Sequence, residues 1–309
     1  MDKIDIIIPV KDRDKERIQL CINSLSGLPM GEVIVVNYGS KVFEDMVIKS
    51  SIPLRAIHYD KNPIWNKAHA LNLGIKSTKS KYIMTVDCDM ILNKELKERI
   101  VKNLGENNFL YNTNVRRIHP ANISLDEETN FKKSRPWFGN NRNQFYSKAN
   151  GGIQIYSRDF INHVGGVDED FGVYFGAMDN RVYEQACMAL MNVINLNFPM
   201  LHQEHENKKE DNLPEDEREL AELTKIIKSQ ELNNLIEKNS YVRKKPWGED
   251  KPHQDKYLNK AKNYIKFQEK GTKAQKEFLL GLYDKIQNSK NKEGKVLVDG
   301  TEYTVTIGK

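Results

Sequence analysis

A short apolar run, Tyr82–Val86, ends directly in the acidic tripeptide Asp87-Cys88-Asp89. An uninterrupted apolar run of this length is typical of a strand buried on both faces of a parallel sheet. Ligands of open α/β sheets bind at the carboxyl ends of such strands. Two carboxylates one residue apart at that edge suit Mg²⁺ or Mn²⁺, particularly when a substrate diphosphate completes the coordination shell. The feature therefore predicts an α/β fold with a metal-assisted site at the edge of its sheet.

The rest of the first 100 residues supports this fold class. Apolar strands are predicted at residues 4–10, 32–36 and 54–58, and amphipathic helices at residues 15–25 and 66–75. Strands that alternate with helices indicate a parallel sheet with right-handed crossovers. The same acidic spacing occurs at residues 12–14 and 168–170, and the buried strand before Asp87 distinguishes its copy from these.

The chain changes character beyond residue 100. A polar, Asn-rich loop around residues 140–143 and a glycine-marked segment at residues 151–176 predict a lid or binding loop. A strand-like run at residues 193–201 would return His202 to the edge of the sheet that carries Asp87. From about residue 206, Lys, Glu, Asn and Gln dominate. Helices are predicted there at residues 220–235 and 256–286, followed by a β-hairpin with an Asp-Gly turn at residues 296–305.

The composition excludes several classes of protein. Hydrophobic residues make up 39% of the 309 residues, and the mean hydropathy is −0.67. No apolar stretch approaches the roughly 18–20 residues that span a bilayer. The three cysteines, Cys21, Cys88 and Cys187, lie far apart and are expected to be reduced thiols, so we expect a cytoplasmic protein without a signal peptide. The net charge of +5 permits an anionic substrate but does not demand nucleic acid.

An ordered series of segments resembles the inverting GT-A glycosyltransferases of family 2. Residues 6–10, 21–25 and 32–40 resemble the opening of that family, and residues 65–75, beginning Trp65-Asn66, resemble the helix before its Asp-x-Asp strand. Trp65-Asn66, Asp87-Cys88-Asp89 and His202-Gln203-Glu204 together resemble the chondroitin polymerase type. Residues 151–152, 165–169 and 175–179 resemble the galactosyltransferase-like C-terminal half of the fold. The resemblance covers about residues 3–206.

The resemblance implies a GT-A fold, in which a Rossmann-like, mostly parallel sheet flanked by helices binds a nucleotide sugar. We expect a catalytic domain at residues 1–206, made of a nucleotide-sugar-binding half (residues 1–100) and an acceptor half (residues 101–206). A helical extension at residues 207–290 and a β-hairpin at residues 291–309 are expected to follow.

The implied function is metal-dependent, inverting transfer of a hexose or N-acetylhexosamine. The donor is a nucleotide diphosphate sugar, with UDP expected, and the acceptor is a glycan hydroxyl. The expected cofactor is Mn²⁺ or Mg²⁺, bound by Asp87, Asp89 and His202, with His205 as the rival to His202. Asp179 is the expected base for the acceptor's proton. A plainer interpretation makes Asp179 the N-cap of a helix at residues 180–191, and the two roles are compatible.

The remaining expected site residues fall into two groups. The nucleotide sugar is expected to contact Pro9, Val10, Asp12, Arg13, Tyr38, Asn66, Asp87, Cys88 and Asp89. The acceptor or its sugar is expected to contact Gly151, Gly152, Trp137, Phe175 and Met178.

Two departures from the family pattern shape these expectations. Asn37-Tyr38 stands where the family usually has an acidic pair, so Asp12 is expected to hydrogen-bond the base and Tyr38 to stack on it. Met178 stands where the family has Glu, whereas Asp179 is retained. The two glycines would let the backbone approach a sugar closely.

Other functions are open at this stage. Residues 241–273 contain ten Lys or Arg against four Asp or Glu, with aromatic residues interleaved. Such a patch could follow a phosphate backbone and stack bases, which would make the acceptor a modified base of nucleic acid. The plainer interpretation is a solvated basic helix. A peptide acceptor is a further alternative, and so is a non-catalytic sugar-nucleotide-binding module in which Met178 marks lost activity.

Overall fold

The computed structural model describes residues 2–40, 52–61, 64–124, 126–136, 151–173, 178–205, 215–249, 256–257, 259–262, 293–298 and 301–306. The chain divides into two compact units, Met1–Leu258 and Asn259–Lys309. Trp137, Phe175 and most of the predicted helix at residues 256–286 lie outside the described residues.

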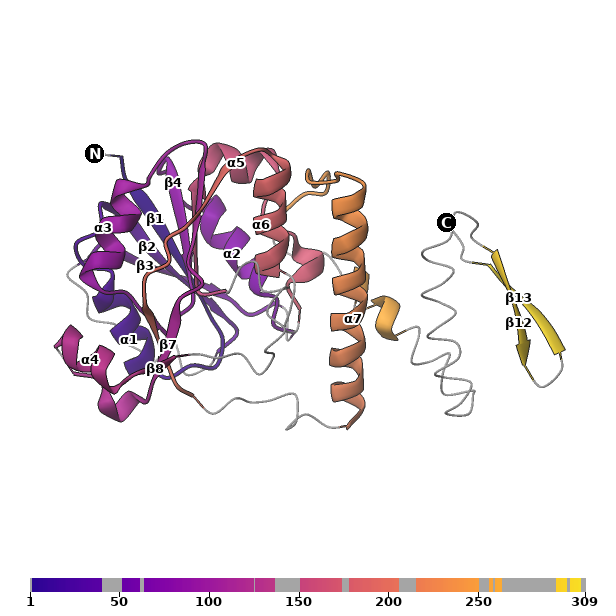
Figure 1. Ribbon diagram of the computed structural model, residues 1–309, viewed down its shortest axis with the longest axis horizontal. Coiled ribbons are helices and arrows are strands. Elements are labelled where there is room, and N and C mark those ends of the chain that lie inside the picture. The colour runs from indigo at the N-terminus through magenta and orange to yellow at the C-terminus, as the bar shows by residue number, and fades with distance from the viewer. Residues whose placement is uncertain are drawn as a thin grey trace. The chain divides into compact units, whose positions relative to one another are not determined.

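A seven-stranded sheet forms the centre of the first unit, in the order β10-β6-β9-β4-β1-β2-β3 (Figure 1). Its strands are β1 (Ile4–Val10), β2 (Met30–Tyr38), β3 (Leu54–Tyr59), β4 (Tyr82–Val86), β6 (Asn108–Tyr111), β9 (Ile153–Ser157) and β10 (Asn192–Asn195). The four predicted strands are confirmed and pair in parallel. Strand β9 runs antiparallel between β4 and β6, so the sheet is mixed but mostly parallel.

Helices cover both faces of this sheet, and its interior strand β1 is apolar on both. Ile4, Ile6 and Ile8 join the core that also holds the buried residues of α1 (Lys15–Ser24) and α3 (Lys94–Lys102). Ile7 points the other way, toward Gly74 of α2 (Lys67–Lys76). The helices α5 (Arg158–His163) and α6 (Met178–Met188) lie on the same side as α2 (Figure 1).

A second, four-stranded sheet has the order β5-β11-β7-β8. Its strands are β5 (Met90–Ile91), β7 (Val115–Ile118), β8 (Arg135–Pro136) and β11 (Met200–Gln203). The single strand predicted at residues 193–201 is therefore wrong: β10 and β11 belong to different sheets. The chain turns between them at Asn197, whose φ is +45°. His202 still reaches the edge near Asp89, because β11 pairs with β5, which follows Asp87-Cys88-Asp89.

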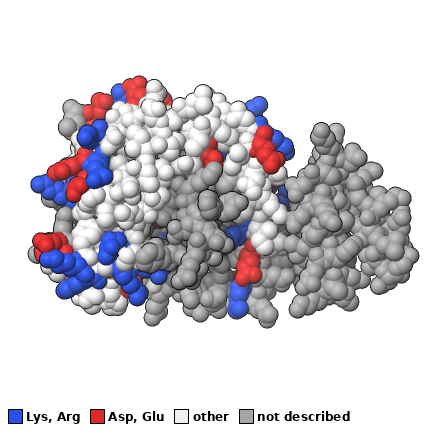
Figure 2. Space-filling model, viewed as in Figure 1, with Lys and Arg blue, Asp and Glu red and all other residues white. Residues whose placement is uncertain are grey.

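The remaining elements are η2 (Pro120–Asn122), α4 (Glu127–Lys133), η3 (Glu169–Phe171), α7 (Glu215–Glu237), β12 (Glu293–Val298) and β13 (Thr301–Thr306). The predicted helix at residues 220–235 is confirmed as part of α7, and the predicted hairpin is confirmed as the antiparallel pair β12 and β13. Charged side chains of both signs lie over α3 and α4 on the face shown in Figure 2. Within the described residues, no helix is long and apolar enough to cross a membrane.

Candidate active site

Hydrogen bonds connect the turn after β4 to the residue before β9 and to α1. The backbone N–H of Asp87 donates to the Gly152 carbonyl at 2.9 Å, and the thiol of Cys21 lies 3.6 Å from the Asp87 carbonyl. The Cys88 side chain is buried in the core, and its expected contact with the nucleotide sugar stays a prediction. The two carboxylates therefore project from a fixed turn at the carboxyl end of β4.

Asp89 lies within a cluster of metal-ligating side chains. Its Oδ2 is 3.5 Å from Nε2 of His202 and 3.3 Å from Nε2 of His205, and one ligand atom from each residue lies within 4.8 Å of the others. The other carboxylate oxygen, Oδ1, is buried without a hydrogen-bond partner. Burial raises the pKa of Asp89, but hydrogen bonds and charge from the two imidazoles outweigh it and hold the pKa well below its ordinary value.

This donor set fits a divalent cation. A carboxylate and two imidazoles are ligands that divalent metal ions accept, and the orphaned carboxylate oxygen leaves a lone pair available. The sequence treated His202 and His205 as rivals, whereas the structure brings both to Asp89. Asp87, also expected to bind metal, is not part of this cluster of described residues.

Asp87 instead lies against a lysine that the sequence analysis did not single out. Nζ of Lys67 is 2.6 Å from Asp87 Oδ1 and 3.6 Å from Asp179 Oδ1. Burial lowers the pKa of Lys67, but the charges of Asp179 and Asp87 outweigh it and raise the pKa above its ordinary value. Burial likewise raises the pKa of Asp87, and Lys67 opposes that rise. The position of Lys67 directly after Trp65-Asn66, at the first residue of α2, was the available signal.

Asp179 lies in the first turn of α6, which begins at Met178. It is therefore not the N-cap that the plainer interpretation predicted. Its carbonyl accepts from Nε2 of Gln154 at 2.9 Å. A Cβ placed on residue 151 would lie only 2.5 Å from Asp179 Oδ2, so glycine is what lets this carboxylate lie over the chain that enters β9.

Gly152 and Met178 are enclosed by other parts of the protein. A Cβ on Gly152 would meet Met200 and Met90, and Gly152 itself has a φ of +135° that other residues rarely adopt. The Met178 side chain is buried. Of the acceptor residues expected from sequence, Gly151 is therefore the described one that lies against a candidate catalytic group.

Several residues that were expected to contact the nucleotide are buried within the protein. Pro9 and Val10 are buried in β1. Tyr38 is fully buried, with its hydroxyl 3.0 Å from Nδ1 of His69 and its ring edge-on to Trp65. The ring thus packs within the protein, and its expected stacking on a base stays a prediction.

Asn66 is likewise engaged within the protein. Its Oδ1 accepts from the His69 N–H at 3.0 Å and caps α2, while its Nδ2 donates to the Glu169 carbonyl at 3.0 Å. The side chain is 1% exposed. The side chain thus fixes the start of α2, and its expected contact with the nucleotide stays a prediction.

The carboxyl ends of β1 and β2 meet at Ser40. Its Oγ accepts from the Asp12 N–H at 2.6 Å, and its own N–H donates to Asn37 Oδ1 at 3.1 Å. Asp12 has a φ of +50° and is exposed, and Arg13 is partly exposed. Asp12 and Arg13 are therefore the expected nucleotide residues whose side chains reach the surface beside β1.

The basic stretch after α7 turns toward the protein. Arg243 is buried, and its Nε lies 3.4 Å from Asp168 Oδ1, while Nζ of Lys245 lies 2.8 Å from Asp170 Oδ2. Tyr257 is 2% exposed. Arg243 and Lys245 therefore pair with buried acids, although Lys245 itself is exposed, and a role for residues 241–273 in binding nucleic acid stays a prediction.

The comparisons with known proteins agree with this geometry. The sequence matches the profile of Glycosyl transferase family 2 over residues 5–164, just over half of the chain. The chain belongs to glycosyl transferase family 2. An "uncharacterized glycosyltransferase" of Rickettsia bellii (strain RML369-C) is 32% identical to this glycosyltransferase over 133 residues. That match covers 43% of this chain but spans only 18% of the length of the relative.

Two solved structures share the fold of this glycosyltransferase. The mannosyltransferase PcManGT from Pyrobaculum calidifontis, solved in complex with GDP-Man and Mn²⁺, has a TM-score of 0.52 and 13% identity, covering 94% of this chain and 81% of its own. GalNAc-T7, solved with UDP, GalNAc and Mn²⁺, has a TM-score of 0.52 and 9% identity, covering 78% of this chain and 55% of its own. The fold is therefore the GT-A fold that the sequence predicted.

Proposed function

We propose that this family 2 glycosyltransferase moves a hexosyl or N-acetylhexosaminyl group from a nucleotide diphosphate sugar to a glycan hydroxyl, with inversion. The observation that carries the proposal is a pair of charged groups beside the turn that follows β4. One is Asp89 with its two imidazoles. The other is Asp179 of α6, which shares Lys67 with Asp87. PcManGT and GalNAc-T7 bind a nucleotide or nucleotide sugar together with Mn²⁺, which supports this donor class and a divalent cation.

Asp89, His202 and His205 are the residues that would hold the cation. A bound cation supplies positive charge that stabilises the departing diphosphate. Because two of the three proposed ligands are imidazoles, Mn²⁺ suits the set better than Mg²⁺. Asp87 then has a different role from Asp89, since its carboxylate is balanced by Lys67 at 2.6 Å.

Asp179 is the proposed base. The acceptor oxygen forms a bond to the anomeric carbon as the bond from that carbon to the diphosphate breaks, and Asp179 takes the hydroxyl proton. A single displacement of this kind inverts the anomeric configuration. Nζ of Lys67 lies 3.6 Å from Asp179 Oδ1, so its positive charge lies beside the proposed base.

The test is a panel of UDP-, GDP- and TDP-sugars incubated with Mn²⁺, scored for nucleotide release with and without glycan, peptide or DNA acceptors. We expect glycan to accelerate release from one donor and the NMR spectrum of the product to show an inverted anomeric centre. A product of retained configuration would refute the assignment of Asp179. Release that only DNA or peptide accelerates would replace the acceptor class.

A further inference from the structure

Three consecutive acids are buried behind the candidate site. Asp168, Glu169 and Asp170 are 7%, 0% and 5% exposed, in and next to η3. Buried carboxylates are costly unless each is paired or hydrogen-bonded. Asp168 pairs with Arg181 of α6, and further partners of the acids come from residues 243–248, well beyond the residues matched to the family.

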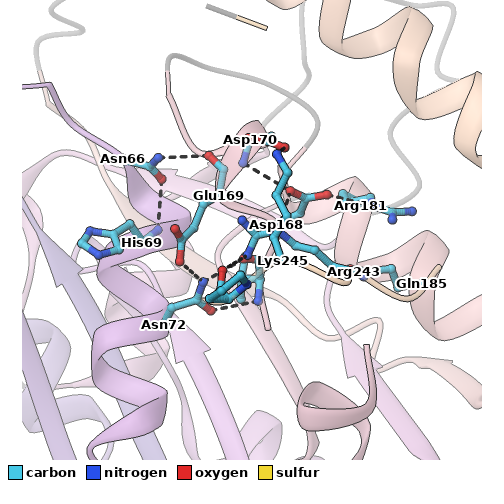
Figure 3. Close-up of polar contacts among 12 residues, drawn as sticks. Asn66, His69, Asn72, Asp168, Glu169, Asp170, Arg181, Gln185, Arg243 and Lys245 are labelled. Atoms are coloured by element: carbon cyan, nitrogen blue, oxygen red, sulfur yellow. Dashed lines mark hydrogen bonds and ion pairs between the residues drawn. The ribbon is translucent and has the colours of Figure 1, made fainter. Parts of the chain in front are cut away.

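Residues 240–249, which we call the C-terminal strap, provide a partner for each of the three acids. Nε of Arg243 is 3.4 Å from Asp168, and Nζ of Lys245 is 2.8 Å from Asp170. The backbone N–H of Gly248 donates to Glu169 Oε1 at 2.8 Å. Figure 3 shows Arg243 and Lys245 directed at the acids between α2 and the strap.

The surface under the strap is shaped to receive it. The Arg243 N–H donates to the Val164 carbonyl at 2.8 Å. Gly165 and Gly166 follow with φ values of +81° and +76°. A Cβ on Gly165 would collide with the Arg243 carbonyl, and one on Gly166 would collide with the Trp247 ring. The strap therefore packs along a defined backbone path.

Glu169 connects the strap to the start of α2. Its Oε1 also accepts from Asn72 Nδ2 at 2.7 Å, and its carbonyl accepts from Nδ2 of Asn66, the N-cap of α2. A second link runs through His69, whose Nε2 donates to the Glu249 carbonyl at 2.8 Å. Figure 3 shows Asn66, His69 and Asn72 gathered around Glu169.

Lys67 is the first residue of the helix that these contacts fix. Its backbone N–H donates to the carbonyl of Gly172, which directly follows η3, at 3.0 Å. Its ammonium lies between Asp87 and Asp179. A shift of η3 or of the helix start would therefore move the charge that Asp87 and Asp179 share.

We infer that the C-terminal strap is a positioning element of the active site, which holds η3 and the start of α2 so that Lys67 stays between Asp87 and Asp179. This inference rests on the proposed function for its catalytic consequence. The strap contacts none of the reacting groups itself. Its effect reaches the site through Glu169, Asn66 and Lys67.

The test compares Lys245→Ala with Lys244→Ala in the full chain. Both variants remove one positive charge from the strap, but Lys244 is exposed and only Lys245 pairs with Asp170. Hydrogen exchange of peptides covering residues 66–72 reports on the start of α2 without depending on activity. We expect Lys245→Ala to speed exchange there by about threefold or more, with β1 and β4 unchanged. Lys244→Ala should match the wild type, and Lys245→Arg should restore it.

The catalytic readout is the split between kcat and KM. We expect Lys245→Ala to lower kcat about 5- to 10-fold while the KM for the donor changes less than about twofold, because geometry is lost and not donor contacts. Arg243→Ala should have the same pattern with larger amplitude. If Arg243→Ala does not fold, Lys245→Ala still decides the question.

Two results would overturn the inference. One is unchanged exchange at residues 66–72 in Lys245→Ala, and the other is faster exchange spread equally over β1 and β4, which would mean general destabilisation. A wild-type protein inactive with every donor would instead refute the proposed function. In that case, local exchange changes in Lys245→Ala would still support the link from the strap to Lys67.

Discussion

Nζ of Lys67 lies 2.6 Å from Oδ1 of Asp87, while Asp89, two residues further on, lies against two histidines. The two acids of the tripeptide therefore have different surroundings. One is balanced by a lysine of α2, and the other is presented to a metal-ligating pair. Because the two carboxylates have different partners, the first three predictions can be tested independently of one another.

Lys67→Met removes the charge between Asp87 and Asp179 and retains most of the side-chain length. We expect kcat to fall about 10²-fold, comparable with the loss of one preorganised electrostatic contact in other active sites. Lys79→Met, an exposed lysine just after the same helix, is the control and should stay within about twofold of the wild type. Equal kcat values for the two variants would remove Lys67 from the site.

Asp179→Asn tests the base. We expect transfer to fall by about 10²- to 10⁴-fold with donor affinity nearly unchanged, because the proton acceptor is lost and the donor contacts are not. Asp159→Asn is the matched control, since Asp159 also lies in the first turn of a short helix. Donor affinity is measured by calorimetry and transfer by product formation. Normal transfer by Asp179→Asn would leave this residue a structural role in α6.

Metal removal should abolish transfer, and Mn²⁺ should restore it. We expect His202→Ala and His205→Ala each to weaken Mn²⁺ binding by at least about tenfold, since each is proposed to supply a ligand. The exposed His119 provides the control variant, His119→Ala. Calorimetric titration of Mn²⁺ measures the effect. If only one variant loses affinity, only that histidine binds the metal, and full activity in EDTA would refute the metal site.

Truncation tests how much of the chain the catalytic unit needs. A protein ending at residue 258, the limit of the first compact unit, should keep its melting temperature and donor affinity. A protein ending at residue 206 loses α7 and the strap, leaving Asp170 and Asp168 without Lys245 and Arg243. A buried charge stripped of its partner costs about 3–5 kcal/mol, a large part of the typical stability of about 5–15 kcal/mol. We expect no cooperative melting of the shorter protein by circular dichroism, and a normal melt would contradict this.

The fold could largely be predicted from the sequence, because three of its first four strands are mostly apolar runs and helical patterns lie between them. The proposed metal ligands could also be placed near Asp89, since β4 and β11 end at the same edge. The division at residues 193–201 could not, because an apolar run does not reveal that its two halves join different sheets.

Other features depended on contacts between distant residues. From the sequence, Tyr38 is expected to be a surface aromatic residue at the end of a strand, but in the structure His69 and Trp65 pack against it. Likewise, Arg243 and Lys245 resemble a basic patch until the acids at residues 168–170 are seen facing them. Charge along a sequence does not show which charges neutralise one another across the fold.

The family profile ends at residue 164, just before the three buried acids, and the basic partners Arg243 and Lys245 lie some 75 residues further along the chain than Asp168 and Asp170. Exchanging C-terminal segments between relatives would therefore separate the acids from their bases, even when both parents carry the same catalytic residues. A chimaera of this protein should inherit residues 168–170 and the strap from one parent. The segment that can be exchanged as a unit is therefore set by which acids and bases pair, and not by where the family match ends.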